Sequence, residues 1–269
     1  MFSTQQSMFS TLQIEQEPSA ISLSDLYTHK ASFRYSELDI ENNSENKIPD
    51  FTGKKALLFI SVGQAYHEKG KFLATIELVN KYAFKSCDIV MADTLQRHNH
   101  RGNMGLEKAT EYSKKAGDLW LERSQHALNL FKLPHQIIRW DELLNHSDYD
   151  GLKELIVKEY HENKEYAEAI QANVLTYIDR LSLINPLTDK DTLFRHGLDY
   201  LIEECPIVMP MWAKMGYDFI IYPKPLTIGM AKTRELFLSE EDQDKCQWLY
   251  LRFKKKNTPG CSSAANADN

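Results

Sequence analysis

A serine at the end of a hydrophobic run is the first feature of this sequence that could carry out chemistry. Ser61 ends the apolar part of KALLFISV (55–62), and Gly63 and Gln64 follow in a predicted turn. Serine is one of the residue types whose side chain can act as a nucleophile. In doubly wound folds, ligands bind beyond the carboxyl ends of the strands, which is where these residues would lie. The ordinary alternative is a serine that closes a strand and a glycine that makes the turn.

Two tyrosines and a glutamate could handle protons or an amine. Tyr200 and Glu204 in DYLIEECP are four residues apart, so they share one face of a predicted helix with apolar neighbours. A carboxyl group on such a face can have a raised pKa and can hold or deprotonate an amine. Tyr222 ends the apolar part of YDFIIYP, where its phenol could relay a proton. The ordinary alternatives are a surface glutamate and an aromatic side chain that fills space.

The hydrophobic pattern around these residues predicts alternating strands and helices. Short apolar segments indicate strands at 55–62, 87–93, 135–140, 217–223 and 247–253. Longer amphipathic segments indicate helices at 66–84, 106–131, 151–184 and 189–208. Such alternation is typical of a parallel sheet with right-handed crossover connections. The predicted fold class is therefore α/β, a Rossmann-like parallel sheet with flanking helices.

Composition indicates a soluble globular protein, because 42% of the 269 residues are hydrophobic and 26% are charged. We expect one catalytic domain at 51–256, between a mobile polar extension at 1–50 and a disordered tail at 257–269. The formal net charge of −6 argues against a general nucleic-acid binder, so any RNA contact must use a local basic patch.

Several common sites are excluded by spacing. Gly63, Gly70 and Lys71 do not form a phosphate-binding P-loop, because the spacing is too long and Phe72 replaces the required serine or threonine. The first predicted strand is followed by no GxGxxG motif, and there is no GxSxG motif. These absences argue against an NTPase, a dinucleotide-binding enzyme and an α/β-hydrolase.

The cysteine spacing and the N-terminal segment indicate where in the cell the protein is expected and whether a metal site is expected. The four cysteines lack CxxC spacing, so neither a disulfide framework nor a zinc site is predicted, and a cytoplasmic location fits best. The N-terminal segment lacks the pattern of a signal peptide, and no apolar run is long enough to span a membrane. His67 and Glu68 lack the second histidine of a zinc protease helix, so no metal site is expected.

Four short sequence motifs, which occur in the same order, resemble those of the cyclodipeptide synthase family. They are FISVGQAYHEKGKF, DTLQRHN, DYLIEECPIV and FIIYPKP, and the match spans about 55–225. The four motifs in this order identify the family more specifically than any one of them does alone. In that family the fold resembles the catalytic domain of class I aminoacyl-tRNA synthetases, so the resemblance implies the same fold here.

The resemblance also implies roles for individual residues. The family's acyl-carrying serine falls on Ser61, with Gly63 and Gln64 expected to contact substrate. The family's helical tyrosine and glutamate fall on Tyr200 and Glu204, which would hold the amino group of the first aminoacyl moiety. Its second catalytic tyrosine falls on Tyr222.

The family has two branches that differ beside the catalytic serine and the second tyrosine. One branch has asparagine three positions after the serine and histidine after the tyrosine, whereas the other has a variable residue and proline. This chain has Gln64 and Pro223, so it resembles the second, Tyr-Pro branch. The asparagine-based contacts of the first branch are not carried over.

The implied reaction joins two aminoacyl groups into a cyclic dipeptide. Because the substrates arrive as activated esters, no ATP, metal or other cofactor is expected. The expected partners are the acceptor ends of two aminoacyl-tRNAs, with no DNA and no membrane, and we expect a monomer. The competing hypotheses are a catalytically silent synthetase-like domain that binds tRNA and a serine esterase of unusual motif.

RNA contact is expected from the helix at 106–131, which in the family supplies a basic face. Lys114, Lys115 and Arg123 could share one side of it, although Asp118 and Glu122 dilute the patch. The alternative is a solvated helix of mixed charge.

Overall fold

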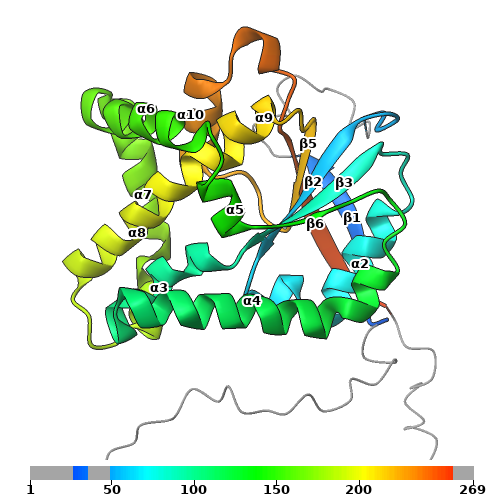
Figure 1. Cartoon of the computed structure of the whole chain (residues 1–269), viewed down its shortest axis with the longest axis horizontal. Helices are drawn as coiled ribbons and strands as arrows, with labels where there is room; N and C mark the ends of the chain where they lie inside the picture. Colours follow the sequence, from blue (N-terminus) through cyan, green and yellow to red (C-terminus); the bar gives the residue numbers. More distant parts are fainter. Residues whose placement is uncertain (1–26, 36–48, 257–269) are drawn as a thin grey trace, which may run out of the picture.

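The computed structural model describes residues 27–35 and 49–256, which form a six-stranded sheet flanked by helices (Figure 1). The spatial strand order is β1-β6-β5-β2-β3-β4. The strands are β1 (His29–Tyr35), β2 (Lys55–Ser61), β3 (Ser86–Ala92), β4 (Ile137–Arg139), β5 (Phe219–Tyr222) and β6 (Gln247–Lys255). All neighbouring pairs are parallel except β1 with β6. The predicted α/β fold is confirmed.

Strand β1 adds an antiparallel edge that the sequence does not predict. It falls within 1–50, predicted to be a mobile extension, and for this segment that prediction is wrong. Its seven residues pair with β6, and the buried ring of Phe33 contacts that of Phe51. Residues 1–26 and 36–48, and the predicted tail at 257–269, lie outside the described residues.

The helices between the strands cover both faces of the sheet. The α-helices are α2 (Lys69–Val79), α3 (Arg97–Met104), α4 (Leu106–Asn129), α5 (Trp140–Leu144), α6 (Tyr149–Glu162), α7 (Lys164–Ile184), α8 (Lys190–Pro206), α9 (Trp212–Lys214) and α10 (Ile228–Phe237). Short helical turns are η2 (Ala65–His67), η3 (Thr94–Gln96), η4 (Ile207–Met211) and η5 (Glu240–Asp242). No helix in the described ranges is both long and apolar enough to cross a membrane.

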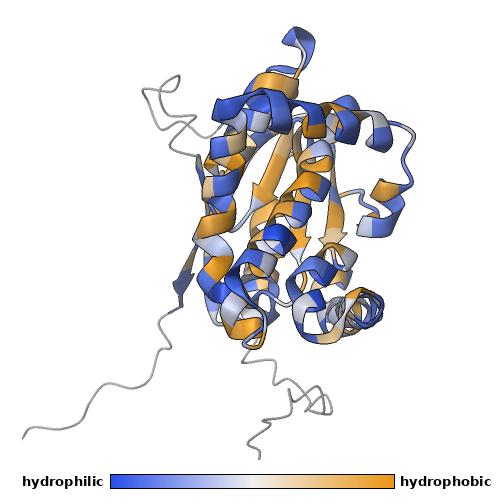
Figure 2. Ribbon diagram, turned by 90° about the vertical axis from the view of Figure 1, so that its left-hand side faces the viewer, coloured by the Kyte–Doolittle hydropathy of each residue, from blue (hydrophilic) through white to orange (hydrophobic). Residues whose placement is uncertain are grey.

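Two hydrophobic clusters lie on opposite faces of the sheet, because successive strand residues point to opposite sides. In β2, Leu57 and Phe59 join the cluster covered by α5, α6, α7, α8 and α10. Ala56, Leu58 and Ile60 join the cluster covered by α2 and α4. In Figure 2 the strands are largely hydrophobic, whereas the helices also carry hydrophilic residues. Burial on both faces explains why the parallel strands read as continuous apolar runs.

Local chemistry explains where the predicted helices change. The single helix predicted at 151–184 is two helices, because Asn163 leaves the helical conformation and its side chain accepts a hydrogen bond from the Tyr166 amide at 3.2 Å, which caps α7. α8 ends at Pro206, and the chain continues as the π-helical turn η4, which contains Pro210. Neither proline has an amide hydrogen to donate to an α-helical bond. The polar segment at 97–101 is helical and lies in α3.

Candidate active site

The ends of β2 and β5 meet where the strand order of the sheet reverses. From β2 the chain builds outward through β3 and β4, and it later returns to the other side of β2 to form β5 and β6. Doubly wound sheets bind ligands at the carboxyl ends of the strands at this switch point. Ser61 is the last residue of β2 and Tyr222 is the last residue of β5. Two of the predicted site residues are therefore neighbours because of topology.

Three hydroxyl groups form a row at this position. The Ser61 Oγ lies 3.0 Å from the Tyr222 hydroxyl, which in turn lies 3.0 Å from the Tyr66 hydroxyl. Ser61 is 5% exposed, so its hydroxyl is largely shielded from bulk water. A row of hydrogen-bonded hydroxyls can transfer a proton between a buried serine and groups nearer the solvent.

The turn after β2 brings Tyr66 to the site. Gly63 has a φ of 84°, a left-handed conformation that favours glycine, and the Gln64 amide donates to the Ser61 carbonyl oxygen at 3.3 Å. The chain then enters η2, which contains Tyr66. Sequence reasoning did not select Tyr66, although its position five residues after Ser61 in a short turn is a usable signal.

Helix α8 places Tyr200 and Glu204 at the same cavity, as their spacing predicts. The cavity has a volume of about 540 Å³ and is lined by Ser61, Tyr222, Tyr200 and Glu204 among others. This is the size of a small-molecule site. Apolar side chains from the sheet and helices complete the lining, including Phe59, Leu201, Val208, Met230 and Trp248. The predicted catalytic residues are thus brought together at one site.

Glu204 lies in an environment that favours its neutral form. Burial raises the pKa of its carboxyl group to about 8, and the negative charge of Glu203 adds to the rise. A hydrogen bond with Tyr200 acts in the opposite direction. Near neutral pH the carboxyl group is therefore mostly protonated and can exchange its proton with an amine.

The adjacent Glu203 points into a polar network instead. It pairs with Arg97 and lies 3.0 Å from the Nε2 of His98, and it accepts a hydrogen bond from the Trp140 Nε1 at 2.9 Å. Burial alone would raise the pKa of Glu203, but the hydrogen bond with His98 and the charges of His98 and Arg97 lower it overall. Glu203 therefore remains ionised beside a protonated Glu204.

The phenols at the site stay protonated near neutral pH. Burial raises the pKa of Tyr66, and it raises the pKa values of Tyr200 and Tyr222 well above the ordinary value. These phenols can relay a proton, but they are not ionised near neutral pH and so do not act as bases by themselves. His67, the one histidine close to Ser61 in sequence, is neutral because burial lowers its pKa to about 3. Its ring lies 5.6 Å from that of Tyr222, centroid to centroid.

Comparison with solved structures finds proteins of the same fold and one of clearly related sequence. A cyclodipeptide synthase from Fluoribacter dumoffii is 35% identical, with a TM-score of 0.76, over 85% of this chain and 99% of its own. The chain belongs to the cyclodipeptide synthase family. A cyclodipeptide synthase from Candidatus Glomeribacter gigasporarum, solved bound to Phe-tRNAPhe, is 17% identical with a TM-score of 0.64 over 87% and 98% of the two chains.

A cyclodipeptide synthetase from Mycobacterium tuberculosis, described as related to type I tRNA synthetases, also shares the fold. It is 12% identical with a TM-score of 0.58 over 86% and 95% of the two chains. The fold of this cyclodipeptide synthase family member is thus the one predicted. No protein-family model matches the sequence, and no curated protein matches it.

Gln64 and Gly63 border a second space beside the first. Gln64 lines both the main cavity and an adjoining cavity of about 170 Å³, and Gly63 lines the smaller one. Gln96, Asn99 and Arg180 also line both cavities. Arg180 was not selected from the sequence, because α7 carries no motif and only the tertiary structure brings it to the site.

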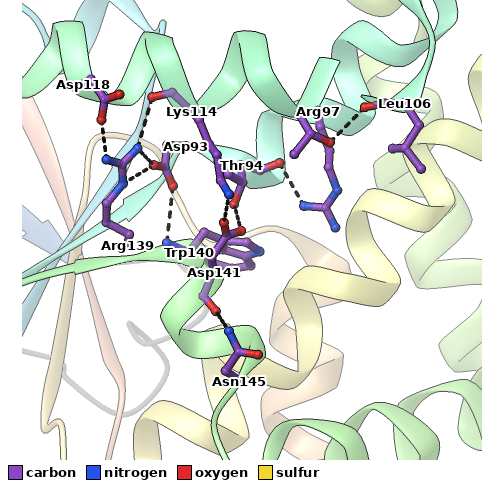
Figure 3. A network of polar contacts seen from close by, with 11 residues as sticks. Asp93, Thr94, Arg97, Leu106, Lys114, Asp118, Arg139, Trp140, Asp141 and Asn145 are labelled. Atoms are coloured by element: carbon purple, nitrogen blue, oxygen red, sulfur yellow. Dashed lines mark hydrogen bonds and ion pairs between the residues drawn. The ribbon is translucent and has the colours of Figure 1, made fainter. Parts of the chain in front are cut away.

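The predicted RNA-binding residues lie on α4 but are partly engaged with acidic groups. The Lys114 ammonium forms an ion pair with Asp141 (Figure 3), at a distance of 3.0 Å. The Arg123 guanidinium is 3.0 Å from Glu68. Lys115 is exposed and has no ion pair within the described part of the chain. Asp118, which the sequence suggests would dilute the patch, is paired with Arg139 (Figure 3). RNA contact by this face stays a prediction.

No group of three or more potential metal ligands (His, Cys, Asp or Glu) occurs in the described ranges.

Proposed function

We propose that the chain is a tRNA-dependent cyclodipeptide synthase that uses Ser61 as its nucleophile. The contact between the Ser61 Oγ and the Tyr222 hydroxyl, inside the cavity that also holds Glu204, carries the proposal. Family membership supports the same reaction class. Gln64 and Pro223 support assignment to the Tyr-Pro branch.

The first step transfers an aminoacyl group to the protein. The Ser61 Oγ attacks the ester carbonyl carbon of an aminoacyl-tRNA, a new ester bond forms, and the bond to the ribose oxygen breaks. The serine proton passes to the departing ribose oxygen, with the Tyr222 and Tyr66 hydroxyls as the available relay. Exchange of one ester for another is close to neutral in free energy, so no ATP is needed.

The second step makes the peptide bond. Glu204 and Tyr200 hold the amino group of the bound aminoacyl moiety, and Glu204 takes up or returns its proton. This amine attacks the ester carbonyl of the second aminoacyl-tRNA, so the C–N bond forms and the second tRNA leaves with a proton. A dipeptide remains attached to Ser61.

Ring closure releases the product. The free amine of the dipeptide attacks the Ser61 ester, a second C–N bond forms, and the bond to Oγ breaks. Tyr222 donates a proton to the departing Oγ and receives one from the attacking amine. The product is a cyclic dipeptide, and Ser61 is restored.

Two measurements test the proposal. Expression in a bacterial host, followed by mass spectrometry of the medium, should reveal cyclic dipeptides that a Ser61→Ala culture lacks. Purified protein mixed with one radiolabelled aminoacyl-tRNA should retain label that survives acid precipitation and is released by mild alkali, as expected for a serine ester. Label retained on Ser61→Ala would assign the acyl group to another residue. Product from Ser61→Ala, with no labelled wild-type intermediate, would rule out the covalent route. RNA binding with neither label nor product would support the silent binding domain, and hydrolysis of simple esters without RNA would support an esterase.

A further inference from the structure

Two cationic side chains lie at the exposed margin of the active-site cavity. Arg180 comes from α7 and Lys224 follows β5, and both line the cavity of about 540 Å³. Both residues are exposed, whereas Ser61 and Glu204 in the same cavity are buried. Within the described ranges, neither Arg180 nor Lys224 forms an ion pair with an acidic residue, in contrast to Lys114 on α4.

Aromatic rings hold both cations in place. The Arg180 guanidinium carbon lies 5.0 Å from the centroid of the Tyr177 ring, and the Lys224 ammonium lies 5.7 Å from the centroid of the Tyr66 ring. A guanidinium on an aromatic ring is positioned while N–H donors stay free for a ligand. The Tyr66 hydroxyl contacts that of Tyr222, which contacts Ser61, so one row of side chains leads from the reacting oxygen to Lys224.

Arg180 also lies where the two cavities meet. It lines the main cavity and the adjoining cavity of about 170 Å³. An aminoacyl ester with its carbonyl at Ser61 must direct its ribose away from the buried end of the cavity. The phosphodiester attached to that ribose then reaches the exposed margin, where the only unpaired cations lining the main cavity in the described part of the chain are Arg180 and Lys224.

We propose that Arg180 and Lys224 form a binding site for the phosphodiester of the 3′-terminal nucleotide of the aminoacyl-tRNA. This inference rests on the proposed function. It adds a contact with the tRNA that is separate from the one predicted for α4. A guanidinium can bind a phosphate through two hydrogen bonds, and a lysine adds a point charge. A carboxylate on the aminoacyl side chain is the competing anion, but the exposure of both cations favours a group that remains in contact with water.

The test compares two acyl donors that share the aminoacyl group. One donor is aminoacyl-tRNA and the other is a small activated ester of the same amino acid that has no nucleotide. Arg180→Gln should raise KM for aminoacyl-tRNA by roughly 10-fold or more, the effect of losing a charge-assisted hydrogen bond. The loss with the small ester should be at least several-fold smaller. Lys224→Gln should act in the same direction, and Arg180→Lys should recover part of the loss.

Binding of uncharged tRNA provides a readout that does not depend on the reaction. Arg180→Gln should weaken it and lower the dependence of log Kd on log salt by about one charge. Lys132→Gln is the matched control, because Lys132 is exposed and lies just before β4, at the amino edge of the sheet. It should change neither KM nor Kd.

Other results of these assays would lead to different conclusions. Unchanged RNA binding and KM in Arg180→Gln would overturn the phosphate site. Equal losses with both donors, seen only for acidic amino acids, would assign the cations to a side-chain carboxylate instead. A wild-type protein that binds RNA through Arg180 but forms no acyl-enzyme would retain this site and reject the proposed function.

Discussion

Glu203 and Glu204 are consecutive residues of α8 whose carboxyl groups lie in opposite environments. Glu203 contacts Arg97, His98 and Trp140, and the pKa of its carboxyl group is lowered despite burial. Glu204 faces the cavity, and burial together with the Glu203 charge raises the pKa of its carboxyl group to about 8. One carboxylate held ionised thus helps to keep its neighbour protonated.

Glu203→Gln should destabilise the protein and make Glu204 more acidic. Removing the carboxylate leaves Arg97 without its buried partner, which typically costs about 3 kcal/mol in the free energy of unfolding. Urea unfolding measures the loss. Asp199→Asn is the control, because Asp199 pairs with Arg101 but its side chain is 53% exposed, so the expected loss is below about 1 kcal/mol. Equal losses in the two variants would contradict a special role for the Glu203 network.

Glu204→Gln should abolish most product formation and change the pH dependence of stability. Losing a positioned acid or base typically slows a reaction by roughly 10²–10⁴-fold. Because the folded-state pKa is raised from 4.5 to about 8, the folded wild type holds a proton that the unfolded chain releases. Its contribution to stability is complete below the unfolded pKa and is lost as pH rises through about 8.

The glutamine variant lacks this titration. The stability of wild type relative to Glu204→Gln should therefore decline between acidic pH and about pH 9, as measured by urea unfolding. In Glu203→Gln, the same decline should end at lower pH and be smaller in total, since one cause of the raised folded-state pKa has been removed. A pH-independent difference would show that Glu204 is ionised in the folded protein, and wild-type product yield would remove it from the mechanism.

Tyr222→Phe should lower product formation without disturbing the fold. The variant keeps the ring, which lies 5.4 Å from that of Phe59 and 5.6 Å from that of Trp248, and loses only the hydroxyl that contacts Ser61. Product formation should fall by roughly 10²-fold or more. Tyr66→Phe is the matched control, since it removes the next hydroxyl in the row and should have a smaller effect. A larger effect from Tyr66→Phe would assign the main proton transfer to Tyr66.

Replacing Lys114, Lys115 and Arg123 by alanine should weaken the use of aminoacyl-tRNA. If α4 contacts the acceptor stem, KM should rise and its dependence on salt should flatten. Lys115→Ala alone should give part of this effect without loss of stability, because Lys115 has no ion pair among the described residues. Unchanged kinetics of the triple variant at low and high salt would place the acceptor stem elsewhere.

Gly117→Ala should destabilise the protein although alanine favours helices. A Cβ at Gly117 would lie 2.7 Å from an Asp93 carboxylate oxygen and 2.8 Å from an Arg139 nitrogen, in the network of Figure 3. Overpacking of this kind typically costs about 1–3 kcal/mol. Gly151→Ala is the control, because a Cβ at this position of α6 would meet no atom within 4 Å, so stability should rise by about 0.5–1 kcal/mol. Thermal unfolding of both variants checks the prediction.

The sequence by itself determines which residues can meet through local periodicity. Ser61 and Tyr222 end apolar strands, and strand ends in a parallel sheet share one edge. Tyr200 and Glu204 share a face because four residues complete about one helical turn. The helical spacing depends only on residues close along the chain, and the position of each strand end follows from its own apolar segment. The direct contact between Ser61 and Tyr222 also requires that β2 and β5 be adjacent strands, which the tertiary structure decides.

Contacts between distant segments are decided only by the tertiary structure. Strand β1 has little apolar pattern of its own, and its pairing with β6 requires a partner more than 200 residues away. The opposite protonation of Glu203 and Glu204 depends on Arg97, about 100 residues upstream, because pKa values respond to burial and to charges that are close in space. The same holds for Arg180 and Lys224, which reach one cavity from a helix and a loop that share no sequence pattern.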